Sequence, residues 1–191
     1  MPDALDRTAY ELAFDENFTD PALDQPAWRV EDGELRASNM QTGIFSGPLG
    51  SAVGQLAFWL VGFEEESPES SGETCVAGLF GNAIEPRRCG VRVGVKAHND
   101  PRLHDDMDEV ALELDATDWH TYSAEWTAER IRFFVDDQLV RAVHQRIDYA
   151  LQAMVDLFEF PAGTDRDPAA YPKVGEVKAV RGYSRPPGRP R

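Results

Sequence analysis

The stretch that decides the fold class runs from residue 120 to residue 143 and reads HTYSAEWTAERIRFFVDDQLVRAV. In its first part Tyr122 and Trp126 alternate with polar residues, and alternation with period two is typical of a half-buried strand. This pattern predicts that Trp126 packs inward while Glu125 faces solvent. Two further apolar runs flank Asp136-Asp137, which predicts a two-residue hairpin turn whose second residue needs a positive φ. The stretch therefore predicts antiparallel strands.

The same pattern extends along the rest of the chain. Short alternating segments lie at residues 91–96 and 110–114, and residues 151–160 form a mostly apolar run that suits a strand covered on both faces or facing an aromatic cleft. No helix longer than about two turns is predicted. Many short antiparallel strands separated by turn residues predict an all-β fold, an antiparallel β-sandwich or jelly roll, forming a single domain over residues 1–184. Residues 185–191 form a basic, proline-rich tail.

The composition narrows the possible classes of function. The 191 residues include 19 Lys and Arg against 34 Asp and Glu, a formal net charge of −15, and 42% are hydrophobic. These values suit one globular domain with a sizeable core. An acidic surface repels phosphate backbones, so nucleic acid is not an expected partner. No run approaches 18 apolar residues and the start lacks a secretory signal, so we expect no membrane partner and a chain that is cytoplasmic or has lost a leader.

Residues typical of metal or cofactor sites are sparse. Cys75 and Cys89 are too few for a disulfide framework or a structural zinc site, and both are predicted to be reduced and buried. The four histidines show no metal-ligand spacing, and no phosphate loop, dinucleotide fingerprint or Ser-His-Asp order occurs. We therefore expect no metal and no cofactor. His98 follows the segment at residues 91–96, a position that allows a place in a cleft without specifying one.

Three segments together resemble a known family. They are the opening FDENF at residues 14–18, the block at residues 120–161 that ends in VDLFEFP, and the closing segment at residues 177–183. This set is similar to glycoside hydrolase family 16, whose members are β-jelly rolls of the concanavalin A-like lectin/glucanase superfamily. The resemblance implies a retaining hydrolysis of β-linked polysaccharide, of the β-1,3 or mixed-linkage glucan type, with a polysaccharide or oligosaccharide as partner.

The family carries its catalytic residues on one strand in the pattern Glu-x-Asp-x-x-Glu. In order, these are a nucleophile, a helper aspartate and a general acid/base. Residues i and i+2 of a strand share a face, whereas i+5 points the other way unless a bulge inserts one residue. A bulged strand of this kind can hold two carboxylates about 5–5.5 Å apart, the separation that double displacement requires.

The equivalent strand here is ETCVAG at residues 73–78. The resemblance places Glu73 at the nucleophile position, Cys75 at the helper position and Gly78 at the acid/base position. Without a bulge, Ala77 would take the last position. Neither residue can donate a proton, and proton transfer by a placed side chain is worth about 10²–10⁴-fold in rate. Hydrolysis is therefore expected to be impaired.

Several interpretations stay open at this stage. Glu85, Asp156 or Glu159 could in principle replace the missing acid, but no motif places any of them at the site. The chain is an impaired glycosidase, a non-catalytic β-glycan-binding protein, or a degenerate paralogue that binds no sugar. In the last case Glu73 is an ordinary solvent-facing carboxylate on a strand. The sequence leaves open which glycan and linkage are bound, and the oligomeric state.

Four residues are assigned to sugar binding. Trp59 is expected to line the cleft, because a flat indole covers the apolar face of a pyranose ring at little entropic cost; the alternative is a core tryptophan. Side chains alternate between the two faces of the predicted strand at residues 151–160, and the face with the more polar side chains is assigned to the glycan. That face includes Gln152, Asp156 and Phe158.

The chain departs from the family pattern in two further respects. Residues 50–55 run directly into FWLVGFE at residues 58–64, where family members usually carry additional strands, so a shortened member with a reduced number of strands is expected. Lys178 stands where many relatives have a calcium-binding aspartate, which argues against that metal. Members of the family are often secreted.

Overall fold

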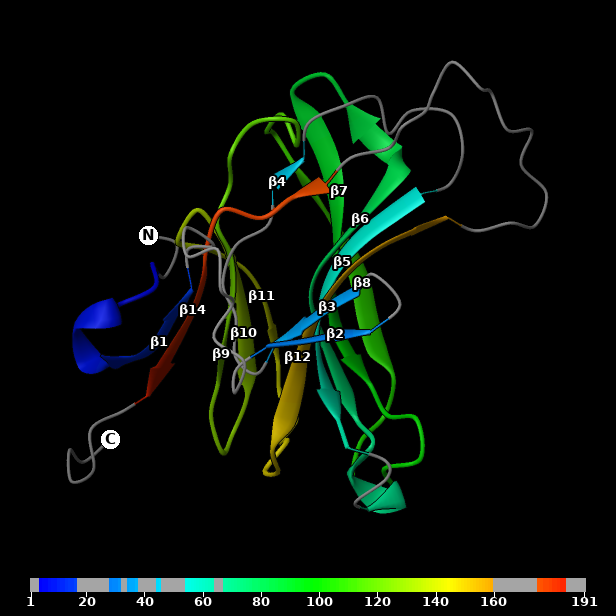
Figure 1. Ribbon diagram of the computed structural model, residues 1–191, viewed down its shortest axis with the longest axis vertical. Helices are drawn as coiled ribbons and strands as arrows, with labels where there is room; N and C mark the ends of the chain where they lie inside the picture. The colour runs from blue at the N-terminus through cyan, green and yellow to red at the C-terminus, as the bar shows by residue number, and fades with distance from the viewer. Residues whose placement is uncertain are drawn as a thin grey trace.

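The computed structural model describes residues 4–16, 28–31, 34–37, 44–45, 54–63, 67–159 and 175–184 (Figure 1). Apart from two short 3₁₀ helices, η1 (Arg7–Ala9) and η2 (Pro68–Ser70), the regular structure in these ranges is β-strand. Every strand pair is antiparallel. The described residues contain no helix long and apolar enough to cross a membrane. The predicted all-β class and antiparallel sandwich are confirmed.

Among the described residues, the largest sheet has seven strands in the order β2-β3-β12-β5-β6-β7-β8. Its strands are β2 (Trp28–Glu31), β3 (Glu34–Ala37), β12 (Leu151–Glu159), β5 (Gly54–Gly62), β6 (Glu73–Glu85), β7 (Arg88–Lys96) and β8 (Asp106–Leu112). β12 lies between β3 and β5 although it comes late in the chain, which is the crossover that closes a jelly-roll sheet.

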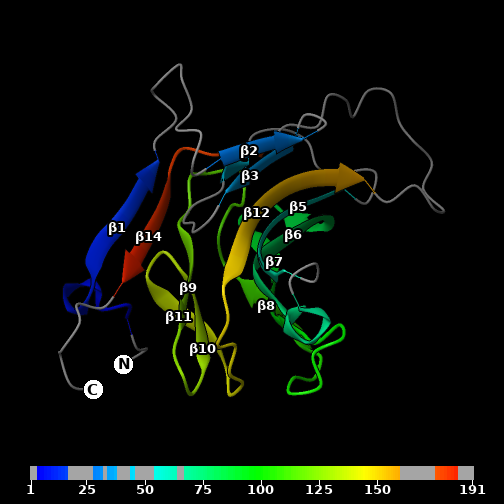
Figure 2. The same ribbon diagram turned by 60° about the horizontal axis from the view of Figure 1, so that its bottom comes forward.

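The remaining strands form three smaller sheets. One has the order β11-β10-β9, and the other two are the pairs β1-β14 and β13-β4. Figure 2 shows β9, β10 and β11 stacked beside one face of the seven-stranded sheet, with β1 and β14 further out on the same side. Their bounds are β9 (Tyr122–Trp126), β10 (Ile131–Val135), β11 (Gln138–Val143), β1 (Glu11–Glu16), β14 (Val180–Ser184), β4 (Ile44–Phe45) and β13 (Gly175–Glu176).

The main hydrophobic core fills the space between the two stacked sheets. Alternate residues of β7, from Val91 to Val95, are fully buried there, together with Phe133 from β10. Because side chains alternate across a strand, the intervening residues of the seven-stranded sheet point to its other side. We call this side, which faces away from β9–β11, the outer face.

The hairpin predicted around Asp136-Asp137 is present. β10 and β11 pair on either side of it, and the two aspartates have φ values of 48° and 64°. Both lie in the left-handed region that a tight hairpin turn of this kind requires. The predicted φ > 0 at the second position is thus confirmed.

The predicted orientation of β9 is wrong at its C-terminal end. The Glu125 side chain is buried, because Arg132 donates to it at 2.6 Å and the Tyr10 hydroxyl also donates to it. Trp126, the last residue of the strand, is 41% exposed. The N-terminal segment that carries Tyr10 covers the side of the sheet that simple alternation assigned to solvent.

One arginine ties the two layers together. Arg141, on β11, donates to the carbonyl oxygens of Val93 at 3.2 Å and Asp106 at 2.8 Å, and it pairs with the Asp106 carboxylate at 2.5 Å. Gly94 next to it has a φ of 145°, and an ideal Cβ there would lie 2.1 Å from the Asp106 oxygen. Only glycine leaves room for this contact.

Candidate active site on the outer face

A β-bulge in β6 sets the arrangement of the candidate catalytic residues. Cys75 pairs with Trp59 on β5, but the next pair along the sheet is Ala77 with Phe58, so Val76 is the extra residue. The bulge turns Ala77 into the main core and brings Gly78 back to the face that Glu73 and Cys75 share. The predicted bulge is therefore present at the predicted place.

The strand register groups the outer-face residues into three cross-strand rows. Each row crosses β12, β5, β6 and β7, and two of them reach β8. The first row holds Gln152, Val61, Glu73 and Lys96; the second Met154, Trp59, Cys75, Gly94 and Met107; the third Asp156, Ala57, Gly78, Arg92 and Glu109. Gln152 and Asp156 thus share a face with Glu73, as the polar parity predicted. The Phe158 side chain lies outside the described residues.

Glu73 is partly accessible and has a defined partner. Its side chain is 20% exposed, and Oε2 lies 2.8 Å from Nε2 of His98, in the turn after β7. Lys96 is directly opposite Glu73 in the register. The sequence allowed His98 a place in a cleft but did not pair it with Glu73. The feature of the sequence that could have indicated this pair is that His98 comes two residues after Lys96, the strand partner of Glu73.

The position of the missing acid/base is occupied by groups that cannot replace it. An ideal Cβ on Gly78 would lie 3.0 Å from Gln55 Nε2, 3.3 Å from Cys75 Sγ and 3.5 Å from Arg92 Cβ. Gln55 is 3% exposed, so its amide is held in a packed environment. None of these three nearest atoms belongs to a carboxylic acid. The side chains that surround Gly78 at closest range therefore contain no proton donor of the kind the family uses.

The three alternative carboxyls differ in their placement. Asp156 is in the same row as Gly78, with Ala57 between them, so their backbones are about 10 Å apart at the usual strand spacing. Glu85 is exposed at the far end of β6, where it is paired in register with Arg88. The Glu159 side chain lies outside the described residues. Of the three, Asp156 is the one that shares a row with Gly78.

Cys75 contributes no charge to the site. It is fully buried, and its thiol donates to the carbonyl oxygen of Arg92 at 3.4 Å. Burial raises the pKa of the Cys75 thiol far above its usual value; Lys96 opposes this shift, and Asp156 and Glu73 add to it. The helper position therefore holds a neutral thiol where the family pattern has an aspartate. Both cysteines are free and buried, as predicted.

Trp59 lies on the outer face but is packed there. Its side chain belongs to a second apolar cluster with Ala57 and Cys75, against which Val61, Met107 and Met154 pack. Lys96 Nζ lies 5.5 Å from the centre of the ring, and Trp59 as a whole is 9% exposed. The Trp59 side chain points to the outer face, as expected of a residue that lines a cleft, but it is buried as a core residue is. In this arrangement its ring offers little surface for a sugar.

A second cation, Arg92, lies next to Gly78 in the same row. The Arg92 guanidinium is 4.1 Å from the centre of the Phe80 ring, and its Nε is 3.2 Å from Glu109. This ion pair is half exposed, and such pairs are weak. Arg92 is therefore available to exchange Glu109 for another acceptor.

The described residues contain no group of three His, Cys, Asp or Glu that could hold a metal ion.

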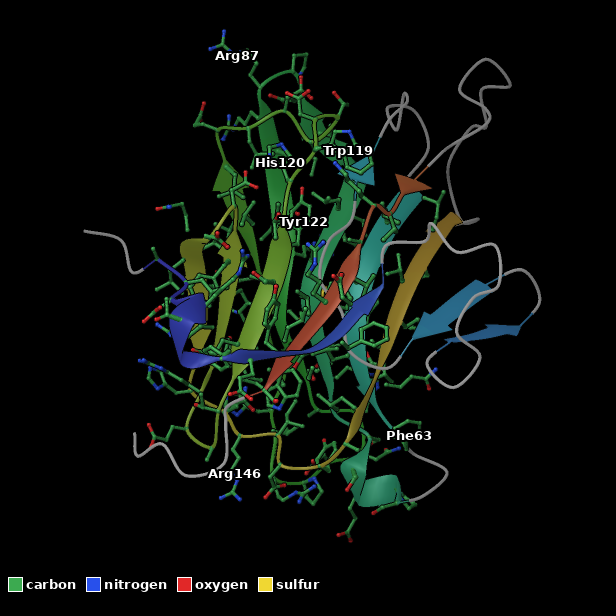
Figure 3. All side chains as sticks on the ribbon, turned by 60° about the vertical axis from the view of Figure 1, so that its left-hand side comes forward. Phe63, Arg87, Trp119, His120, Tyr122 and Arg146 are labelled. Carbon is green, nitrogen blue, oxygen red and sulfur yellow. The ribbon has the colours of Figure 1, made fainter. Side chains whose placement is uncertain are left out.

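Lys178 lies with Nζ 5.4 Å from the centre of the exposed Trp119 ring. Figure 3 shows Trp119 and His120 toward the end of the molecule marked by Arg87, while Phe63 lies at the opposite end. Phe63 directly follows the end of β5 that pairs with Glu73, so Trp119, toward the other end of the molecule, is remote from Glu73.

Comparison with known proteins agrees with the fold. The model of the family described as glycosyl hydrolases family 16 matches residues 97–163. A search of curated protein sequences gave no significant match. The folds of solved glycosidases provide the remaining comparison.

Three solved structures illustrate the similarity. A GlcNAcα1-4Gal-releasing endo-β-galactosidase from Clostridium perfringens superposes with a TM-score of 0.74 at 16% identity, covering 94% of this chain and 64% of that one. An endo-β-1,3-glucanase from Pyrococcus furiosus gives 0.69 at 14%, covering 96% and 98%. The laminarinase catalytic domain from Thermotoga maritima gives 0.67 at 15%, covering 91% and 98%.

The described residues thus share the jelly-roll fold of these solved structures. Residues 97–163 are similar to glycosyl hydrolases family 16, and the described residues share the fold of these solved glycosidases.

Proposed function

We propose that this protein binds β-linked polysaccharide of the β-1,3 or mixed-linkage glucan type on the outer face of its seven-stranded sheet and hydrolyses it slowly. The observation that carries the proposal is the shared face of Glu73, Cys75 and Gly78 across the bulge in β6. A carboxylate is present at the nucleophile position, and no proton donor is present at the acid/base position. The laminarinase and endo-β-1,3-glucanase of similar fold support this class of substrate.

The proposed chemistry is a double displacement that lacks assistance to the leaving group. The Glu73 carboxylate forms a bond to the anomeric carbon, and the glycosidic oxygen departs with the bonding electrons. A sugar alkoxide is a poor leaving group without protonation, and loss of general acid catalysis costs about 10²–10⁴-fold in rate. A phenolate that leaves as a stable anion avoids this cost.

A second candidate function is sugar binding without turnover. It is favoured by the half-exposed Arg92 beside Gly78, whose guanidinium can donate hydrogen bonds to sugar hydroxyls but cannot act as an acid. On this alternative Glu73 accepts a hydrogen bond from a sugar hydroxyl and never attacks it.

Hydrolysis and binding of laminarin and lichenan distinguish the two candidates. Reducing ends measure turnover, and calorimetry measures binding. Reducing-end release that Glu73→Gln abolishes supports the hydrolase. Heat of binding without release, even with an activated aryl β-oligoglucoside, supports the binding protein. Neither release nor binding with any of these glycans would overturn both.

A further inference from the structure

The turn after β7 holds His98 in an unusual backbone conformation. His98 has a φ of 47°, which is uncommon for a residue with a side chain and carries a cost in conformational energy. The turn closes with a hydrogen bond from the Asp100 amide to the carbonyl of Ala97 at 2.9 Å. Such strain persists only where the surrounding structure fixes the backbone. The contacts that fix this turn therefore indicate what His98 does.

A buried carboxylate fixes this turn. The Asp100 side chain is inaccessible to solvent and accepts hydrogen bonds from the backbone amide, Nε and Nη2 of Arg102 at 2.8–2.9 Å. It also accepts a hydrogen bond from the Tyr149 hydroxyl at 2.8 Å. Hydrogen bonds to a buried charge are among the stronger contributions to local rigidity. Asp100 therefore fixes the C-terminal end of the turn that contains His98.

The same network reaches the residues that lead into β6. The Tyr149 hydroxyl accepts a hydrogen bond from the Gly72 amide at 2.9 Å, and Ser71 Oγ accepts one from the Asn99 amide at 3.0 Å. Gly72 is the residue before Glu73, and a Cβ on it would lie 2.4 Å from the Tyr149 hydroxyl. Both ends of the His98–Glu73 pair are thus held by one set of contacts.

We propose that His98 is a positioning residue for the Glu73 nucleophile, holding the carboxylate through the polar contact between Nε2 and Oε2, which lie 2.8 Å apart. An ionised carboxylate only accepts hydrogen bonds, so Nε2 carries the hydrogen. This contact fixes the rotation of the carboxylate and leaves Oε1 as the attacking oxygen. This inference rests on the nucleophilic role of Glu73 in the proposed function.

The other charged groups around Glu73 do not duplicate this contact. Lys96 is opposite in register, but its ammonium group lies over the Trp59 ring. Asp156 lies two strands away, in the row of Gly78. Among the contacts of the described residues, His98 is the ionisable side chain within hydrogen-bonding distance of the Glu73 carboxylate.

A trapping reagent tests the role of His98 without requiring an acid. With a 2,4-dinitrophenyl 2-deoxy-2-fluoro-β-laminaribioside, Glu73 Oε1 forms an ester bond to the anomeric carbon. The bond to oxygen breaks, and dinitrophenolate leaves with the electron pair, unprotonated. His98 keeps its proton throughout. Intact-protein mass spectrometry follows the labelled fraction, giving the maximal labelling rate and the reagent concentration for half-maximal rate separately.

Three variants separate positioning from general structural effects. His98→Leu removes the donor and is expected to lower the maximal labelling rate about tenfold, with little change in the half-maximal concentration. His98→Gln keeps an N–H at a similar reach and is expected to recover most of the rate. His144→Gln, at an exposed histidine, is the matched control and is expected to behave as the wild type.

The outcomes distinguish this inference from the proposed function. Labelling of the wild type on Glu73 that is equally fast in His98→Leu overturns the role of His98 and leaves the nucleophile intact. A His98→Gln variant as slow as His98→Leu also counts against a hydrogen-bonding role. Failure of the wild type to label on Glu73 overturns the nucleophile itself, and the role of His98 falls with it.

Discussion

Gln55 lies against Gly78 on the outer face: its side-chain nitrogen is 3.0 Å from the place where a Cβ on Gly78 would be. The two residues come from neighbouring strands, and Gln55 is almost completely buried. The space beside Gly78, the predicted acid/base position, is thus shared by an amide, a thiol and the stem of an arginine. This contact defines what must move if a carboxylic acid is introduced.

Restoring the acid is expected to restore activity. Gly78 has no positive φ, so its backbone accepts a side chain, and the nearest obstacle is the flexible end of Gln55. Gly78→Glu is expected to raise reducing-end release from laminarin or lichenan at least about tenfold, the low side of what general acid catalysis contributes. Combining it with Gln55→Ser removes the tight contact and is expected to increase the gain.

The control for this variant is Gly78→Gln, which adds nearly the same volume without a proton donor. Circular dichroism checks that each variant folds. A folded Gly78→Glu, Gln55→Ser double variant no faster than the wild type would contradict the placement of the catalytic motif.

Trp59 is expected to act as a packing residue in the unliganded protein. It is 9% exposed and packs with Ala57 and Cys75. Trp59→Ala should lower the free energy of unfolding by about 3–5 kcal/mol, as truncation of a buried aromatic usually does. Urea denaturation measures this loss. A loss below about 1 kcal/mol, together with weaker binding of laminarin, would show instead that the ring serves the ligand more than the fold.

The Asp100 network makes a pH-dependent contribution to stability. The hydrogen bonds from Arg102, opposed by burial and assisted by Tyr149, hold the pKa of the Asp100 carboxyl below its usual value. A lowered folded-state pKa stabilises the fold at pH values above the unfolded pKa, and this stabilisation disappears as the pH falls through the folded value. Asp100→Asn should therefore cost about 2 kcal/mol at neutral pH and progressively less below about pH 4.

Urea titrations of the wild type and Asp100→Asn at several pH values measure this difference. Asp118→Asn, at an exposed position, is the comparison and should show almost no loss at any of them. A cost for Asp100→Asn that stays constant or grows toward acid pH would contradict the assignment of a lowered pKa.

The two thiols are expected to be unreactive in the folded protein. Burial raises the pKa of Cys89 to about 11, and it raises that of Cys75 further. Because the thiolate is the reactive form, a disulfide exchange reagent at about pH 8 should label neither residue in the native state and both in urea. Rapid labelling of native Cys75 would mean that the outer face opens at the candidate site.

The sequence predicted the features that depend on local periodicity. The strands β9–β11 and the Asp136-Asp137 hairpin follow from side-chain spacing, although the orientation of Glu125 and Trp126 does not, and the bulge between Cys75 and Gly78 was implied by the resemblance to family 16. The shared face of Gln152 and Asp156 also follows, because residues separated by an even number of positions on one strand point to the same side. These features are set within one strand or between strands that are adjacent in the chain.

Features set by distant contacts were not predictable in the same way. Glu125 is buried because Tyr10, more than a hundred residues earlier, donates to it. The His98–Glu73 pair depends on a turn held by Asp100 and Tyr149, and the filling of the space at Gly78 depends on Gln55 from another strand. In each case the decisive contact is between side chains of different segments, and the spacing of residues along one strand does not specify it.

The dependence of rate on the leaving group tests the central claim most directly. The wild type is assayed with a series of aryl β-oligoglucosides whose phenols range in pKa from about 4 to about 10, the upper end being ordinary phenol. An enzyme in which Glu73 attacks without a proton donor should lose rate steeply as the phenol becomes less acidic, and Gly78→Glu should flatten that slope. A flat dependence in the wild type, abolished by Glu73→Gln, would reveal a working acid at the site and contradict the account.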